Sequence, residues 1–373
     1  MATLAFTDRL SCIDAFLEEA CVKIQLTQTQ FDSARQKYAA IGRWLSDPAS
    51  PLLRYAPDIY PQGSMSLGTT IRPWQGEEFD LDIVCQLHGC SEYSPEQVFA
   101  AVHQRLNAHG LYSKILEPRN RCLRINYAGD FHLDIIPACP DDTVGSGAIK
   151  VPDRKLAVWK RSNPLGYASS FFERCRYRLS LIEAEEKRFR PLPNNAPSEH
   201  KYPLQRAVQL LKRHRDSFFK GDPDAARSIL LTTLAAGCYQ GQQSLTLALD
   251  GIVDGILAII SQTPGIPVVL NPTNPMENLA EGWNQDTYPQ FIAYVRSLRA
   301  HLGELMRGDG IQATTRALGD LVGEPLAKSV VLAHADQVQR SRNDRSLRVE
   351  PGTGRFSATA GIIVPRNNFY GKC

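Results

Sequence analysis

The sequence predicts an α+β protein of two lobes, with a mixed sheet in the first lobe and helices in the second. Two patterns lead to this fold class. Before residue 140, short segments alternate apolar and polar side chains, which is typical of strands with one buried face. From Pro203 onward, apolar residues recur at the spacing of amphipathic helices. A Pro- and Asn-rich segment at 190–203 separates the patterns, so we expect the loop between the lobes there.

Composition bounds the class of protein before any motif is considered. The 373 residues can bury a large core, and 43% hydrophobic with 22% charged residues is ordinary for a soluble globular protein. A formal net charge of +3 gives no general positive field for long nucleic acid, although small polyanions such as NTPs need only local charge. The most apolar stretch, 252–260, is too short to cross a membrane.

Nine cysteines are scattered along the chain, and none forms a CxxC pair. We therefore expect reduced thiols, and a cytoplasmic location, in place of a disulfide framework or a structural zinc site. The first residues, MATLAFTDRL, lack a basic segment followed by an apolar one, so no secretory signal is expected.

Helices are expected at the start of the chain and again after the first strand. Apolar spacing predicts one helix over 7–26 and a second that begins after Thr27 or Thr29. A third is expected over 95–107, with Ser94 as its cap. The expected divisions of the chain are a helical arm that packs on both lobes (1–50), the sheet lobe (51–190), the helical lobe (200–336) and a polar tail (337–373).

Two aspartates share one face of a predicted strand. The segment FDLDIV, 79–84, alternates, so Asp80 and Asp82 point the same way, with Cα atoms about 6.5 Å apart. Carboxylates left unpaired at that spacing repel each other and are costly to bury. A shared hard cation is the economical explanation.

A third aspartate comes from a predicted hairpin. Strands are expected over 121–127 and 131–136, with a turn at Gly129 and an end at Pro137. The second strand places Asp134 among apolar neighbours. Residues 141–158 are expected to form a loop with a short edge strand, and a helix is expected from Asn163 to Glu186.

Three carboxylates on adjacent strands suit a two-metal site for phosphoryl transfer. Two Mg²⁺ ions, for which Mn²⁺ can substitute, clamp the attacking and leaving oxygens of an in-line displacement. The turn at Gly63 and Ser64 offers backbone N–H groups and a hydroxyl to a triphosphate. Lys212 lies at the edge of an apolar helical stripe, from which its ammonium can reach a cleft.

Each of these features has an ordinary structural explanation as well. A DxD pair on a strand is often solvent-facing, a Gly-Ser pair is often only a turn, and a lysine within LKRHRD is often on a solvated helix face. Their order along one chain makes the signal strong.

Seven segments also resemble one known family in sequence and in order. The sequence resembles the polymerase-β-like nucleotidyltransferases, and within them the CD-NTase family, bacterial relatives of cyclic GMP-AMP synthase and oligoadenylate synthase. The resemblance rests on QGSMSLGTTIRP (62–73), FDLDIV (79–84), HLDIIPA (132–138), SNPLGYASSFF (162–172), PLQRAVQLLKRHRD (203–216), SILLTTLAA (228–236) and NPTNPMENLAEGW (271–283).

The resemblance implies an active site in the cleft between the lobes. It implies Asp80, Asp82 and Asp134 as catalytic metal ligands, Gln62, Gly63 and Ser64 as phosphate or acceptor contacts, Lys212 as the triphosphate lysine and Ser228 as a further phosphate contact. It also implies a monomer that makes a cyclic di- or trinucleotide from NTPs, with ATP and GTP the expected substrates. The product would act in anti-phage (CBASS) signalling through a separate effector protein, and an accessory regulator is a further expected type of partner.

Alternatives remain open at this point. The same scaffold can add nucleotides to an RNA, a protein or a small-molecule hydroxyl, or it can serve as a non-catalytic nucleotide sensor. The residues do not identify the bases, ring size, linkage or activating signal. They also leave open whether the end of the chain, Gly371-Lys372-Cys373, is conjugated to another protein, and the Arg-rich tail has a solvated face as its ordinary explanation.

Overall fold

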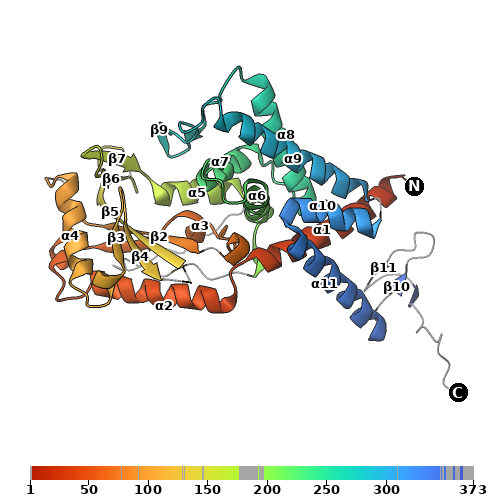
Figure 1. Ribbon diagram of the computed structural model, residues 1–373, viewed down its shortest axis with the longest axis horizontal. Coiled ribbons are helices and arrows are strands. Elements are labelled where there is room, and N and C mark those ends of the chain that lie inside the picture. The colour runs from red at the N-terminus through yellow and green to blue at the C-terminus, as the bar shows by residue number, and fades with distance from the viewer. Residues whose placement is uncertain are drawn as a thin grey trace.

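A mixed sheet lies at one end of the molecule and a group of helices at the other, as the computed structural model shows (Figure 1). The structure describes residues 2–175, 192, 197–344, 346, 348–349, 356–357 and 362–363, except 77, 91, 128, 130, 145–146 and 309. The α+β fold class expected from the sequence is confirmed.

The sheet positions the aspartates. Its main path runs β1-β2-β5-β4-β3, and β6 joins β5 to β7. Strands β2 and β5 are parallel neighbours, and the other pairs are antiparallel. The strands are β1 (Asp58–Pro61), β2 (Phe79–Gln86), β3 (Leu116–Pro118), β4 (Leu123–Tyr127), β5 (Phe131–Pro140), β6 (Ile149–Asp153) and β7 (Val158–Ser162).

Alternation along β2 divides the sheet into an apolar and a polar face. Leu81 and Ile83 are fully buried in a core formed with helices α2 (Gln28–Leu45) and α4 (Pro95–Asn107). Asp80 and Asp82 therefore point to the opposite face. The bounds of α4 and its Ser94 cap agree with the prediction.

Pro137 does not end β5, contrary to the expectation. The strand continues to Pro140, because its pairing partner changes along its length. Residues up to Ile135 pair with β4, whereas Cys139 and Pro140 pair with β6. Pro137 lies between these two sections, where the N–H group it lacks is not needed by either antiparallel neighbour. Residues 141–158, expected to form a loop with a short edge strand, contain β6, which pairs with β7 just after them.

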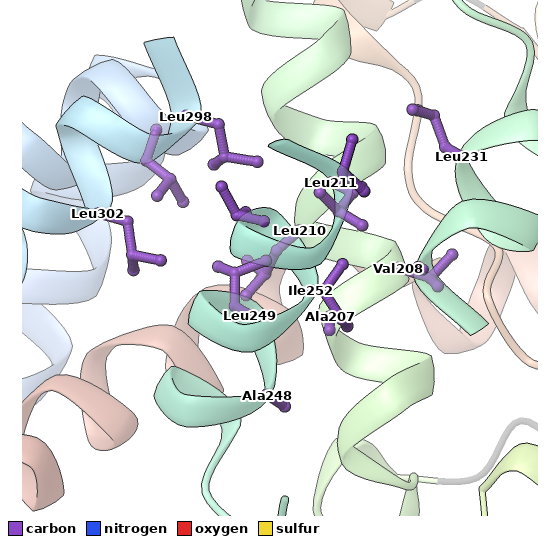
Figure 2. Packing of buried hydrophobic residues seen from close by; sticks show 14 of the residues in the cluster. Ala207, Val208, Leu210, Leu211, Leu231, Ala248, Leu249, Ile252, Leu298 and Leu302 are labelled. Carbon is purple, nitrogen blue, oxygen red and sulfur yellow. The ribbon is translucent and has the colours of Figure 1, made fainter. Parts of the chain in front are cut away.

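The helical region has its own core, in which α6 is central. Ala207, Val208 and Leu211 of α6 pack against α7, α8 and α9 (Figure 2). Helix α1 joins this core through Ile13 and Leu17, whereas α2 packs on the sheet. The helices of this region are α1 (Ala2–Ile24), α5 (Pro164–Arg174), α6 (Pro203–Phe219), α7 (Ser228–Cys238), α8 (Leu245–Gln262), α9 (Thr287–Arg307), α10 (Ile311–Val322) and α11 (Glu324–Asn343).

Helix α8 is the one described helix that is long and apolar enough to cross a bilayer. Its Leu249, Ile252 and Val253 are fully buried against the neighbouring helices, so it serves as a core helix here.

Several elements were not predicted from the sequence, and some expected ones lie outside the described residues. The loop after α8 contains a hairpin, β8 (Leu270–Asn271) with β9 (Asn274–Asn278). Helix α11 continues past Gln337, so the change to polar composition does not end the helical region there. A small sheet follows, made of β10 (Arg348–Val349), β11 (Phe356–Ser357) and β12 (Ile362–Ile363). Outside the described residues lie 176–186 of the expected helix, residues 190, 191 and 193–196 of the expected loop at 190–203, and 371–373.

The expectation of reduced thiols is wrong for one pair. Cys90 and Cys139 are disulfide-bonded, while six other cysteines of the described chain are free. Because β2 and β5 are parallel, the turn after β2 meets the end of β5, which brings together two residues that are 49 positions apart in sequence. A pair formed in this way cannot be predicted from a local sequence motif.

Candidate active site

A pocket of about 760 Å³ lies between the polar face of the sheet and the helices. Its size suits a nucleotide-sized ligand. Seven of the eight residues expected in the site line it: Gln62, Gly63, Ser64, Asp80, Asp82, Lys212 and Ser228. The eighth, Asp134, is buried and is not part of the lining.

The aspartates meet through strand register. Asp82 of β2 is the direct partner of Asp134 on parallel β5, and Asp80 is two residues before Asp82 on the same face. Burial, together with the negative charges of Asp134 and Asp80, raises the pKa of Asp82 to about 7. Burial also raises the pKa of Asp80, and the nearby positive charge of Arg124 opposes that rise. The ionised forms of these neighbouring carboxyl groups therefore disfavour one another.

Arg124 of β4 is the residue that the sequence did not reveal. It is the cross-strand partner of Asp134, so the two side chains share a face. Its Nε and Nη2 donate to the two carboxylate oxygens of Asp134 at 2.7 and 2.8 Å, and Nη2 also lies 3.3 Å from Asp80. The sequence predicted a strand over 121–127, but the register between β4 and β5 was needed to place Arg124 beside Asp134.

The donor chemistry of the cluster fits a hard divalent cation. Carboxylate oxygens are the ligands that such ions prefer, and Asp82 lies on the same strand face as Asp80 and opposite Asp134 on β5. In the part of the chain that is described, however, no three His, Cys, Asp or Glu side chains stand ready to hold a metal ion. The oxygens of Asp134 are instead engaged by Arg124.

The turn before β2 approaches the aspartates closely. The N–H of Gln62 donates to the Asp82 carbonyl at 2.9 Å, and Gly63 starts the short helix α3 (Gly63–Ser66). Gly63 has a φ of +64°, and a Cβ added there would lie 2.9 Å from Asp82 Oδ2. Both facts favour glycine at this position. Ser64 Oγ accepts a hydrogen bond from Thr70.

Lys212 reaches this turn from α6. It is 4% exposed, and its Nζ donates to the carbonyl and hydroxyl oxygens of Thr69 at 3.1 and 3.2 Å. Burial lowers its pKa to about 7. The polar face of α6 contacts the same segment elsewhere, because Gln205 donates to the Leu67 carbonyl. Helix α6 thus holds the turn in place against the helical region.

Two further groups complete the wall on the helical side. Ser228 begins α7, and its Oγ accepts from Arg215, which is ion-paired with Asp216. Away from the aspartates, the pocket is lined by Tyr167 and Glu277. Neither was among the eight expected site residues, although both fall within segments that resemble the family, 162–172 and 271–283.

Hydrogen bonds fix the side chains around Tyr167 and Glu277. Asn271 donates to Glu277 at 2.8 Å, and the hydroxyls of Tyr167 and Thr233 are 2.8 Å apart. This end of the pocket therefore combines an aromatic ring, a carboxylate and an amide, which together can recognise a nucleobase.

Comparisons with known proteins identify one family. Residues 12–174 match the family described as the Second Messenger Oligonucleotide or Dinucleotide Synthetase domain. A protein of Roseivirga ehrenbergii named c-di-GMP synthase is 35% identical over 376 residues, which cover 95% of this chain and 97% of that protein. Cyclic dinucleotide synthase CdnG of Bradyrhizobium diazoefficiens is 26% identical over 393 residues, 95% of this chain and 89% of that protein.

Solved structures share the fold. CdnG of B. diazoefficiens, in complex with GTP, superposes with a TM-score of 0.68 at 23% identity, over 87% of this chain and 99% of that chain. CdnC of Escherichia coli, in a complex with HORMA, superposes with a TM-score of 0.60 at 13% identity, over 81% and 93%. The sheet with its aspartates, the helical wall of the pocket and the extent of the sequence match show that this chain belongs to the CD-NTase family of polymerase-β-like nucleotidyltransferases.

Proposed function

We propose that this protein is a Mg²⁺-dependent synthase that makes a cyclic di- or trinucleotide from NTPs, with GTP as the favoured substrate. One observation supports it above the others. Asp80 and Asp82 line the same pocket as Lys212 and Ser228, which belong to the helical region. The pocket thus offers carboxylates for metal ions on one wall and groups for phosphates on the other.

Acidic and phosphate-binding side chains have different roles in the proposed reaction. Asp80, Asp82 and Asp134 would hold the divalent ions, which activate the attacking hydroxyl and stabilise the departing pyrophosphate when bound. Lys212 and Ser228 bind the triphosphate, together with Gln62 and the turn at Gly63 and Ser64. No side-chain nucleophile is required, because positioning and charge stabilisation supply most of the rate.

The choice of GTP rests on two observations. The relative with 35% identity is named c-di-GMP synthase. In addition, a carboxylate such as that of Glu277 accepts hydrogen bonds from the N1–H and N2–H groups of guanine, whereas adenine has an acceptor at N1. Asn271 holds the Glu277 carboxylate in place, and Tyr167 offers a ring beside it.

The product would act as a second messenger in anti-phage (CBASS) signalling and would activate a separate effector protein. An accessory regulator is also proposed, since the related CdnC was solved with HORMA. The protein would act in the cytoplasm.

Pyrophosphate release tests the reaction class. Wild-type protein is incubated with all four NTPs and Mg²⁺ and compared with the double variant Asp80→Asn/Asp82→Asn. A matched control is Asp142→Asn, which makes the same change at an exposed aspartate of the same lobe. We expect release by the wild type and the control, and loss in the double variant. Equal release by all three proteins would reject the assignment.

A further inference from the structure

Arg124 occupies the oxygens that the proposed metal site needs. Its guanidinium donates to both carboxylate oxygens of Asp134 and approaches Asp80 with the same Nη2. This two-pronged arrangement is among the strongest ion pairs that proteins form. A carboxylate that accepts both prongs cannot at the same time turn these lone pairs toward a metal ion.

The surroundings favour an arginine that stays charged and can leave. Arg124 forms ion pairs with two of the three aspartates, at 2.7 Å to Asp134 and 3.3 Å to Asp80. The Arg124 side chain is 21% exposed, so it has a route to solvent, while the Asp134 side chain is 11% exposed. The aspartates are fixed on the central strands β2 and β5, but the arginine reaches them through a long, flexible side chain from β4.

We propose that Arg124 is a built-in counter-ion that holds Asp134 and Asp80 in the metal-free protein and must be displaced when divalent metal binds. The proposal rests on the proposed function, because it takes the three aspartates as the metal ligands. Arg124 is thus a positioning residue: it preserves the cluster against repulsion before loading, and it sets a threshold for metal binding.

Metal affinity without nucleotide measures this threshold. Mn²⁺ binding is followed by electron paramagnetic resonance in wild type, Arg124→Gln, Arg124→Lys and a control, Arg119→Gln. Arg119 is a matched control because it lies in the turn between β3 and β4, close in sequence to Arg124. It pairs with Glu117 at 2.8 Å, but that pair is exposed and separate from the aspartates. We expect Arg124→Gln to bind Mn²⁺ at least about tenfold more tightly, since no strong ion pair has to be broken first.

The lysine variant distinguishes two effects of Arg124 on metal binding: its pair of hydrogen bonds to Asp134 and its positive charge. It keeps the positive charge but cannot make the two parallel bonds. We expect its Mn²⁺ affinity to fall between those of the wild type and Arg124→Gln, and the Arg119→Gln affinity to match the wild type. An Arg124→Gln affinity within twofold of the wild type, or an Arg124→Lys affinity equal to it, would overturn the proposal.

A second measurement compares the wild-type protein with itself, without metal and with metal. The Nε–H signal of Arg124 is followed by nuclear magnetic resonance and assigned by its loss in Arg124→Lys. We expect a slowly exchanging signal without metal that shifts and exchanges faster at saturating Mg²⁺. A signal unchanged by Mg²⁺ in protein that binds the ion would refute displacement. Absence of Mn²⁺ binding in wild type and all variants, with or without GTP, would instead overturn the metal site on which the proposed function depends.

Discussion

Replacing Gly63 with alanine tests whether the turn before β2 is shaped by its approach to Asp82. Gly63 has a φ of +64°, in the left-handed region, where an alanine costs about 1–2 kcal/mol. The new Cβ would also lie 2.9 Å from Asp82 Oδ2, closer than such atoms pack. Either the turn or the carboxylate must therefore move.

Gly89 provides a control for the backbone strain alone. It has a φ of +67°, but an added Cβ would have nothing within 4 Å. Gly89→Ala should therefore lose the same ~1–2 kcal/mol of unfolding free energy and keep its activity. Gly63→Ala should lose about 100-fold in kcat/KM, the size of effect that a displacement of about 1 Å at a reacting centre produces.

The two variants are compared by urea denaturation and by the rate of pyrophosphate release from GTP. The difference in kcat/KM between them isolates the contact with Asp82, since the strain is common to both. Equal activity of Gly63→Ala and Gly89→Ala would refute the reasoning that glycine is required there by the carboxylate.

Three other changes have expected outcomes of their own. Burial lowers the pKa of Lys212 from 10.5 to about 7, so between these pH values the unfolded chain binds more protons than the folded one. The free energy of unfolding should therefore rise from pH 7 to pH 10. Urea midpoints of Lys212→Met should rise less over this range, and the same rise as in the wild type would contradict the burial argument. Glu277→Gln should lower the preference for GTP over ATP by about 10-fold, from the usual cost of a lost hydrogen bond to a charged group, and competition between labelled nucleotides would show whether the preference stays. Ser228→Ala should raise KM for GTP by several-fold with little change in kcat, whereas a fall in kcat alone would place Ser228 elsewhere in the mechanism.

Much of the fold was predictable because its signals are local. The alternation in FDLDIV and the Ser94-Pro95 start of a helix depend on neighbouring residues only, and both agree with the structure. The continuation of β5 through Pro137 was not predictable, since it depends on a change of partner from β4 to β6. The Cys90–Cys139 disulfide has the same origin in strand order.

The site followed the same division. The sequence placed Asp80 and Asp82 on one face by alternation and Lys212 at the edge of a helical stripe. Family resemblance added Ser228, and the structure brings all four to the same pocket. Arg124 was missed because its position depends on the register between β4 and β5. The hydrogen bonds of α6 to the segment after α3 were missed for a similar reason: Gln205 and Leu67 are 138 residues apart.

The mass of the product made from GTP alone tests the proposed activity most directly. Wild-type protein is incubated with GTP and Mg²⁺, the reaction is treated with phosphatase, and the remaining nucleotide is analysed by mass spectrometry. We predict a phosphatase-resistant species with the mass of a cyclic guanine dinucleotide or trinucleotide, and none from Asp80→Asn/Asp82→Asn. A product that remains linear, or GTP consumed only when an RNA or protein acceptor is added, would contradict cyclic nucleotide synthesis by this pocket.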